Sequence, residues 1–475
     1  MPIQQLPLMK GIAKSQVNAD YIDAMPVNML AVPKEVLDSS GYLRSFPGID
    51  KRDDVAGLSR GVQFNTHESV VYRVLGNKLY RGQSQAGDVS GSSRVGMAHS
   101  ATSQAVAANG VLTLYRYDGT VKTLQNWPSK VGDVTYAQYE IGSVRDVCRL
   151  RGRYIWVKDG SQDFGVTDLE DESHPDQYRP FYTAESQPDG ILGCDSWRDF
   201  AVMFGTSTIE YFSLTGATDT SAAIYVAQPS LMVQKGIAGT FAKCRYADSH
   251  AFVSNPANGS PSVYVISQGS ATQISSVSVD KVLKSYSATD LAQVYMESLR
   301  FDGHELIIIH LPNDVLCYDA SASQNGPQWS ILKTGLYDEP YRAIDFMYEG
   351  NQIICGDKTQ SVTGYLNDAH SSQHDAEQEH LLYTPLFKAD NNLIFDFELE
   401  SSTGISQKTL RLFLSATTDG INFGREQMIS QSRPFEYDRR VLWRRIGRIR
   451  KNVGFKVRVI TMSPVTLSGC QVRIE

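Results

Sequence analysis

The sequence lacks any long apolar segment. Its strongly apolar runs, such as Leu306–Leu311, are far shorter than the roughly 20 residues that a helix needs to cross a bilayer. The first residues, Met1–Leu6, show no charged stretch followed by an apolar one, so they predict no secretory signal. We therefore expect no membrane insertion, and we expect synthesis and assembly in a cytoplasm.

Cysteine is scarce and shows no metal-binding spacing. The six cysteines include no Cys-x-x-Cys pair, and most of them lie inside apolar strands. This distribution predicts buried, reduced thiols and argues against a disulfide framework or a zinc site.

Basic residues are fewer than acidic ones: the chain has 45 Lys and Arg and 52 Asp and Glu, which gives a net charge of −7. This balance argues against a general nucleic-acid coat, although a local basic patch is still open. Continuous helical patterns are few, whereas Gly (37) and Tyr (24) are abundant, which favours many short strands.

Familiar catalytic signatures are absent as well. The chain has no nucleophile elbow, phosphate-binding glycine loop, HExxH helix or dinucleotide fingerprint. A propeller hydrolase would need carboxylates that converge on the central channel, and the candidates are Glu185, Asp189, Asp195, Glu210 and Glu305. The sequence does not show that these converge, so we predict no enzyme, no catalytic residue and no cofactor.

What the chain does contain is a repeat of three strands between Val144 and Leu366. Cys148, Cys194 and Cys244 hold the same place in successive copies, 46 and 50 residues apart. Five clear copies begin at Val147, Leu192, Phe241, Ser298 and Ile344, and two fainter ones at Val62 and Gln104. Fourth strands are expected at 136–139, 223–226, 273–277 and 328–332. A period in the forties with several strands per unit is typical of propeller blades.

The remaining chain is divided around this repeat. We expect an all-β protein with a β-propeller of about seven blades over residues 61–366. An extended N-terminal arm over residues 1–60 packs on it and supplies a strand that closes the ring. A polar linker (367–378) then leads to a C-terminal β-sandwich (379–475), whose strands alternate between apolar and charged residues. Within it, Thr418–Phe423 predicts a hairpin with a tight Asp-Gly turn.

Two polar clusters are candidates for metal binding. The acids of Asp168–Asp176 lack the alternating spacing and internal glycine of a calcium loop, so a solvated loop or a subunit contact is the preferred interpretation. His370, His374 and His380 lie in or beside the polar linker, where zinc is conceivable but a linker fits the composition better. We predict no metal site.

One basic segment stands out in the sandwich, with seven cations and no acid between residues 439 and 451. The interleaved Val441, Trp443, Ile446 and Ile449 predict the inward face of an edge strand. The cations are the candidate subunit or DNA contact, with a merely solvated face as the alternative: Arg439, Arg440, Arg444, Arg445, Arg448, Arg450 and Lys451. We favour a protein contact.

Several long segments resemble one family along the whole chain. They are Pro2–Pro7, Gly41–Ile49, Thr208–Ala217, Gln228–Gly239 and Ser463–Cys470. Together they are similar to the packaged-DNA stabilisation proteins, or tail accessory factors, of short-tailed phages that infect enteric bacteria.

The resemblance implies a structural tail hub and no chemistry. Members of this family form a ring, implied to be hexameric, below the portal and its bound adaptor protein. The ring closes the exit channel for the packaged double-stranded DNA and offers attachment to the tail needle and the tailspikes. The protein would then belong to the virion tail. The alternative function is a glycan-binding or glycan-cleaving propeller of a phage tail, and a third is a cellular scaffold that does not bind the portal.

Overall fold

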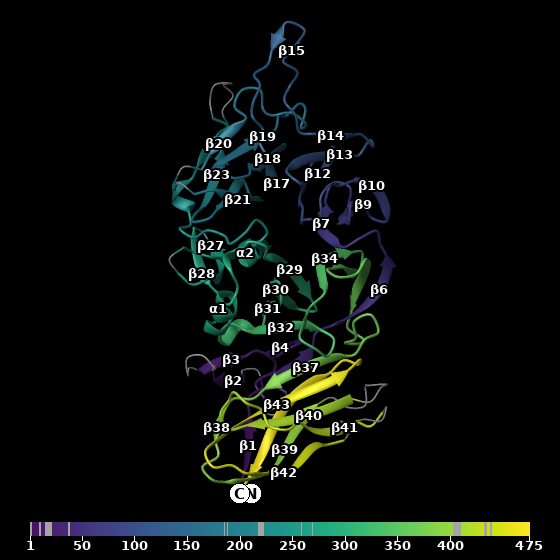
Figure 1. Ribbon diagram of the computed structural model, residues 1–475, viewed down its shortest axis with the longest axis vertical. Coiled ribbons are helices and arrows are strands. Elements are labelled where there is room, and N and C mark those ends of the chain that lie inside the picture. The colour runs from purple at the N-terminus through teal and green to yellow at the C-terminus, as the bar shows by residue number, and fades with distance from the viewer. Residues whose placement is uncertain are drawn as a thin grey trace.

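The computed structural model describes residues 2–8, 11–14, 21–36, 39–184, 186–187, 189–216, 223–257, 259–267, 269–401, 410–431, 435–437 and 439–475. These residues form two bodies along the long axis of the molecule. The upper body is a ring of small sheets, and the lower one is a sandwich at whose far end both chain termini lie (Figure 1). The predicted all-β class, with a propeller and a C-terminal sandwich, is confirmed.

Seven antiparallel sheets make up the ring. The first two are β7 (Ser59–Asn65), β8 (Val70–Leu75), β9 (Lys78–Arg81), β10 (Ser84–Asp88), and β11 (Gly96–His99), β12 (Ser103–Ala108), β13 (Val111–Arg116), β14 (Val121–Thr123). The third and fourth are β17 (Val144–Leu150), β18 (Arg153–Lys158), β19 (Asp163–Val166), β20 (Phe181–Thr183), and β21 (Ile191–Trp197), β22 (Phe200–Gly205), β23 (Ile209–Leu214), β24 (Tyr225–Ala227).

The other three sheets continue around the ring. The fifth has β25 (Lys243–Tyr246), β26 (Ser249–Ser254), β27 (Ser262–Ser267) and β28 (Ser270–Gln273). The sixth has β29 (Tyr295–Phe301), β30 (His304–His310), β31 (Val315–Asp319), β32 (Trp329–Thr334) and β33 (Glu339–Pro340). The seventh has β34 (Ala343–Glu349), β35 (Gln352–Asp357), β36 (Val362–Asn367) and β6 (Gly48–Asp54).

The second strand of every sheet is almost wholly buried, because a neighbouring sheet covers each of its faces. In β30, for example, Leu306–Ile309 are all inaccessible to solvent. A strand buried on both faces needs no polar side, so it reads as a continuous apolar run instead of an alternating one. These runs are the signal that made the repeat visible in the sequence.

The ring is closed by a strand from the N-terminal region. β6 pairs antiparallel with β36, from Gly48 opposite Asn367 to Asp54 opposite Val362. The chain then runs directly into β7, the first strand of the first sheet. The last sheet therefore contains residues from both ends of the propeller, and the ring opens only if this sheet is taken apart.

Two predicted fourth strands are wrong. Residues 136–139 form no strand; instead a two-stranded hairpin, β15 (Lys130–Val131) and β16 (Val134–Thr135), projects beyond the ring at the top of Figure 1. At 273–277 the strand β28 stops at Gln273 and a helix begins at Val277. The reason is Ser276, whose side chain accepts a hydrogen bond from the Val279 amide and caps the helix.

The predicted start of the fainter copy at Gln104 is also wrong, by one strand. Its predicted first strand at Gln104 is the second strand of the sheet, β12, and β11 precedes it. β11 is only four residues long, Gly96–His99, and begins with a glycine, which hides it from a pattern search.

Helices are few in the part of the chain that the structure describes. They are α1 (Val277–Lys284), α2 (Ala288–Leu291) and the short 3-10 turns η1 (Pro229–Leu231) and η2 (Ser323–Asn325). None of them is long and apolar enough to span a bilayer.

The lower body is a sandwich of two antiparallel sheets. One contains β4 (Met29–Val32), β5 (Tyr42–Ser45), β44 (Thr466–Ile474), β39 (Leu393–Ser401) and β42 (Val441–Arg448), with β1 (Ile3–Leu6) beside β44. The other contains β37 (Gln378–Tyr383), β43 (Asn452–Thr461), β40 (Leu410–Thr417) and β41 (Gln427–Gln431), with β38 (Phe387–Lys388) beside β43.

Aromatic side chains fill the space between these sheets. The ring of Phe397 lies 4.8 Å from that of Phe455 and 5.9 Å from that of Trp443. The predicted hairpin at Thr418–Phe423 is present as the link between β40 and β41. It is a longer loop, in which Asp419 accepts the backbone N–H groups of Ile421 and Asn422.

Candidate functional site

The basic segment of the sandwich is an edge strand, as the sequence predicts. β42 pairs only with β39, and it lies at the lower margin of the sandwich, away from the ring (Figure 1). Val441 and Trp443 face the core, and Ile446 and Ile449 pack against it. Trp443 and Ile446, both on the inner face, are three residues apart instead of two because a β-bulge lies between them. At this bulge Arg445 has a left-handed conformation with φ 63°.

Two of the seven cations are paired within the chain. Arg440 makes a two-pronged contact with Glu398, 2.5 Å at each prong, and Arg439 lies 3.3 Å from Glu436. The hydrogen bond from Arg440 lowers the pKa of the Glu398 carboxyl. These two arginines therefore contribute to the sandwich itself.

The other five cations have no side-chain partner among the described residues. All five are exposed along β42 and the turn that follows it: Arg444, Arg445, Arg448, Arg450 and Lys451. An edge strand with several exposed cations and no paired acids resists joining another strand edge to edge. It also gives a patch that suits acidic protein surfaces or phosphate groups.

The carboxylates considered for catalysis are occupied by structural contacts. Asp195 accepts two bonds from Arg245 and lies 3.1 Å from Nε2 of His250, which joins the fourth and fifth sheets. Asp189 accepts the Thr208 amide, and Glu305 pairs with Arg300. Glu210 is buried and accepts the amide of Ser186. Glu185 lies outside the described residues.

A buried ion pair that the sequence did not single out links the third and fifth sheets. Lys243 Nζ lies 2.9 Å from Asp146 Oδ2, and the same oxygen accepts the Cys194 amide of the fourth sheet. Both side chains are almost fully buried. Asp146 sits at a bulge in β17, which turns its carboxylate toward the neighbouring sheets.

The acidic loop Asp168–Asp176 also joins sheets. The Asp171 carboxylate forms ion pairs with two cations of the second sheet, Arg116 at 2.9 Å and Lys122 at 3.1 Å. Burial opposes its charge, yet hydrogen bonds from Ser173 and the charge of Lys122 hold the pKa of Asp171 well below its usual range. The loop is thus a contact within the molecule.

The three histidines do not meet at one point. Nε2 of His370 lies 2.8 Å from Asp50 Oδ1, and His374 lies 3.8 Å from Asp357. His380 is fully buried against the carbonyl of Asn28. Across the residues with described positions, no group of three or more His, Cys, Asp or Glu is arranged to hold a metal.

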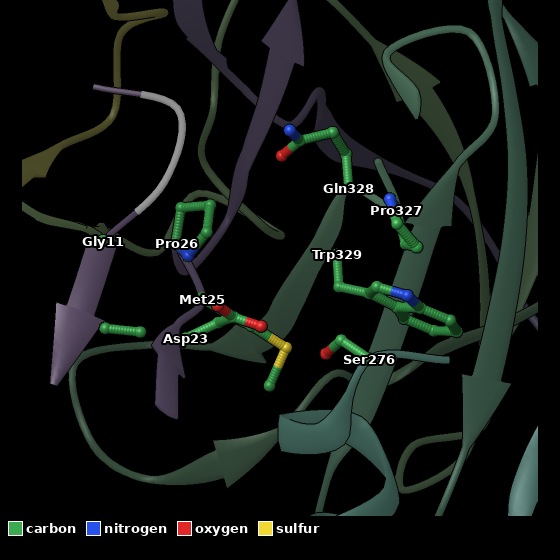
Figure 2. Close-up of a pocket in the computed structure, with 9 residues that line it drawn as sticks. Gly11, Asp23, Met25, Pro26, Ser276, Pro327, Gln328 and Trp329 are labelled. Carbon is green, nitrogen blue, oxygen red and sulfur yellow. The ribbon is translucent and has the colours of Figure 1, made fainter. Parts of the chain in front are cut away.

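A small pocket of about 130 Å³ lies between the N-terminal hairpin β2 (Gly11–Lys14) and β3 (Tyr21–Ala24) and the sixth sheet. Figure 2 shows Met25 and Trp329 on its walls and Ser276 at its side. Trp329 Nε1 donates to the Ile274 carbonyl, and Ser276 caps α1. Both of these polar groups therefore already serve the fold.

Comparison with known proteins identifies relatives of both bodies. One family model, described as bacteriophage P22 Gp10 β-propeller, matches residues 4–371, and a second, bacteriophage P22 Gp10 β-sandwich, matches residues 379–475. The chain is 67% identical to the tail hub protein gp10 of Salmonella phage P22 over 475 residues, which is 100% of each chain.

Likeness to solved structures is weaker. A chain of the mitotic checkpoint complex matches at 12% identity with a TM-score of 0.40, over 74% of this chain and 99% of that one. An exo-β-1,3-galactanase from Phanerochaete chrysosporium matches at 9% identity with a TM-score of 0.30, over 88% and 96%. Scores this low support no statement about function.

Proposed function

This chain belongs to the bacteriophage P22 Gp10 family, and on that premise we propose that it is a structural tail hub protein of a short-tailed phage. It works as an assembly part of the virion tail and has no enzymatic activity. The observation that supports this most strongly is the 67% identity to a tail hub protein along the full length of both chains. The similarity covers both the propeller and the sandwich.

We propose further that six copies form a ring beneath the portal-bound adaptor protein. This ring narrows the exit channel, retains the packaged double-stranded DNA, and holds the tail needle and the tailspikes. The net charge of −7 suits the wall of such a channel, because a wall of like charge lets DNA pass without adhering. Synthesis and assembly take place in the host cytoplasm.

A closed gate must resist pressure, so its two bodies should move together. Several connections between the propeller and the sandwich support such a joint movement. β5 of the sandwich leads directly into β6 of the ring, and Val27 forms bridges to Leu381 in the sandwich and to Ile331 in the ring. We keep 61–366, 367–378 and 379–475 as the proposed propeller, linker and sandwich. The expected arm, residues 1–60, is divided between them, because β1, β4 and β5 belong to a sandwich sheet and β6 to the last propeller sheet.

The exposed basic edge of the sandwich is the proposed contact with a neighbouring subunit. Five cations there are unpaired among the described residues, at Arg444, Arg445, Arg448, Arg450 and Lys451. An acidic chain surrounds them, so a second copy offers the complementary charge. DNA phosphate is the other candidate for this patch.

Electron microscopy of reconstituted complexes tests the assembly. Purified portal–adaptor complexes are mixed with this protein, and the subunits of the added layer are counted in averaged images. A closed layer of six on the adaptor side is the expected result. Complexes that remain bare at saturating protein concentration would refute the hub position.

A charge variant tests the basic edge in the same images. The triple variant Arg444→Glu, Arg445→Glu and Arg448→Glu should leave the fold intact and abolish the closed layer. The matched control changes Lys34, Lys130 and Lys284 to Glu, which are exposed lysines outside the basic edge with no ion pair among the described residues. Equal ring formation by both variants would remove the basic edge from the interface.

A further inference from the structure

A second cavity lies in the propeller, between the first, sixth and seventh sheets. Its volume is about 310 Å³. Three cations line it, Arg60, Arg94 and Lys358, and no carboxylate does. An excess of one charge around a cavity inside a folded protein favours a ligand of the opposite charge.

Two of these cations are fixed by the fold. The guanidinium of Arg60 donates only to backbone carbonyls, those of Ser93 at 2.7 Å, Ser90 at 2.9 Å and Gly76 at 2.8 Å. Arg94 lies 3.4 Å over the ring of Tyr295 and pairs with Asp345. Arg60 therefore keeps an uncompensated positive charge beside the cavity.

The third cation is the free one. The side-chain amine of Lys358 has no hydrogen bond or ion pair within the described part of the chain, although the residue is only half exposed. Burial and the charge of Arg94 lower its pKa to about 8, against the opposing pull of Glu297. An amine in this position lacks the anion that would hold its proton.

The three acids whose charges act on Lys358 are Asp357, Asp345 and Glu297, and each is used by other groups. Asp357 pairs with Arg342 at 2.6 Å. Asp345 is used by Arg94 and by the Ser59 hydroxyl at 2.6 Å. Glu297 lies 2.6 Å from Nε2 of His310 and accepts the Phe346 amide. Burial and the neighbouring charge of Asp345 raise the pKa of Glu297, which weakens the negative charge that it presents to Lys358.

The imidazole of His310 also has a nitrogen without a hydrogen-bond partner. Its ring lines the cavity, it is almost fully buried, and its Nδ1 has no partner. Nε2 of His310 shares a proton with the Glu297 carboxyl, and in the tautomer with the ring proton on Nδ1 that N–H group has no acceptor. A buried N–H donor without an acceptor is rare in native proteins, and a bound oxyanion is one way to satisfy it.

We propose that this cavity binds a phosphate group, either free phosphate or a small phosphate monoester, with the Lys358 amine as its direct ligand. Arg60 and Arg94 supply fixed positive charge around it, and His310 supplies a further donor. Lysine binds phosphate as a point charge, and that is the contact which the Lys358 amine can offer. The proposal does not depend on the role in the tail.

Titration calorimetry with inorganic phosphate and with methyl phosphate tests the proposal at pH 7. The wild-type protein should bind at least one of the two, and Lys358→Met should weaken that binding at least tenfold. The matched control is Lys284→Met, which removes an equal charge from an exposed lysine of α1 and should bind as the wild type does. Binding of inorganic phosphate alone identifies the free ion as the ligand; binding of both identifies a site open to monoesters.

A labelling experiment on the wild-type protein gives an independent readout. At pH 8, acetic anhydride should modify Lys358 faster than a fully protonated lysine, and phosphate should protect Lys358 but not Lys284, as measured by mass spectrometry. No heat with either phosphate compound, unchanged binding by Lys358→Met, or equal labelling of Lys358 with and without phosphate would each overturn the proposal.

Discussion

The backbone carbonyl of Asn28 lies 3.0 Å from Nδ1 of the buried His380, and this contact joins the arm to the sandwich. Asn28 also connects the ring. Its amide donates to the Ile331 carbonyl, its Oδ1 accepts the Lys333 amide at 2.8 Å, and its Nδ2 donates to the Glu379 carbonyl at 2.9 Å. One asparagine in a left-handed conformation (φ 54°) thus satisfies backbone groups of both bodies.

Replacing Asn28 should therefore destabilise the whole chain. Asn28→Ala leaves the Lys333 amide and the Glu379 carbonyl unpaired and strains the left-handed backbone, and we expect a loss of about 3 to 5 kcal/mol in the free energy of unfolding. Denaturant titration measures it. The control is Asn109→Ala, at an exposed left-handed residue (φ 49°), which should cost about 1 to 2 kcal/mol. Equal losses in the two variants would contradict the role of Asn28 at the junction.

The same junction predicts a pH dependence. Burial lowers the pKa of His380 to about 4, although its bond to the Asn28 carbonyl opposes this shift. Between pH 6.5 and 4 the unfolded state takes up a proton that the folded state does not, so acidification destabilises the fold, by up to about 1.4 kcal/mol per pH unit. The stability contributed by the neutral ring is complete above pH 6.5.

The variant His380→Gln isolates this contribution from those of the other histidines. The difference in unfolding free energy between wild type and variant, measured by denaturant titration at several pH values, should shrink as the pH falls from 6.5 toward 4. A difference that stays constant across this range would show that His380 titrates normally in the folded protein.

The buried pair of Lys243 and Asp146 should be worth more than any exposed pair. Lys243→Met leaves the Asp146 carboxylate buried without its cation, and we expect a loss of about 3 to 5 kcal/mol. Arg151→Met breaks a pair whose side chains are 61% and 67% exposed, and it should cost less than about 1 kcal/mol. Thermal unfolding of the two variants compares them, and similar midpoints would refute the ranking.

The cysteines should be unreactive until the chain unfolds. Five of the six are buried and Cys244 is half-buried, each as a free thiol. Burial raises the pKa of Cys244 and of Cys355 to about 12, so almost no thiolate forms at pH 8. A thiol reagent should titrate none of them rapidly in the native protein and all six in denaturant.

Much of the propeller was predictable because its central strands are buried on both faces. Runs such as Leu306–Ile309 are unlike anything on a protein surface, and the shared place of Cys148 and Cys194 fixed the register of the copies. The edge strand β42 was predictable for a related reason, since its cations face solvent and Val441 and Trp443 face the core.

The elements that the sequence did not predict correctly are those whose structure depends on distant contacts. The strand β11 contains few apolar residues and forms because β12 and β17 lie beside it. The helix after β28 depends on one serine cap. The cavity around Lys358 escaped notice because its cations are far apart in the sequence: Arg60 lies in β7, Arg94 in the loop before β11, and Lys358 just after β35. The only local sign is polar residues such as Glu297 and His310 within apolar strands.

Retention of packaged DNA tests the account most directly. DNA-filled heads that carry only portal and adaptor are incubated with the purified protein, and the DNA that becomes accessible to nuclease is measured over time. The wild-type protein should stop the leakage, and the variant with Arg444, Arg445 and Arg448 changed to Glu should not. Equal release of DNA with and without the wild-type protein would contradict the claim that this chain closes the channel.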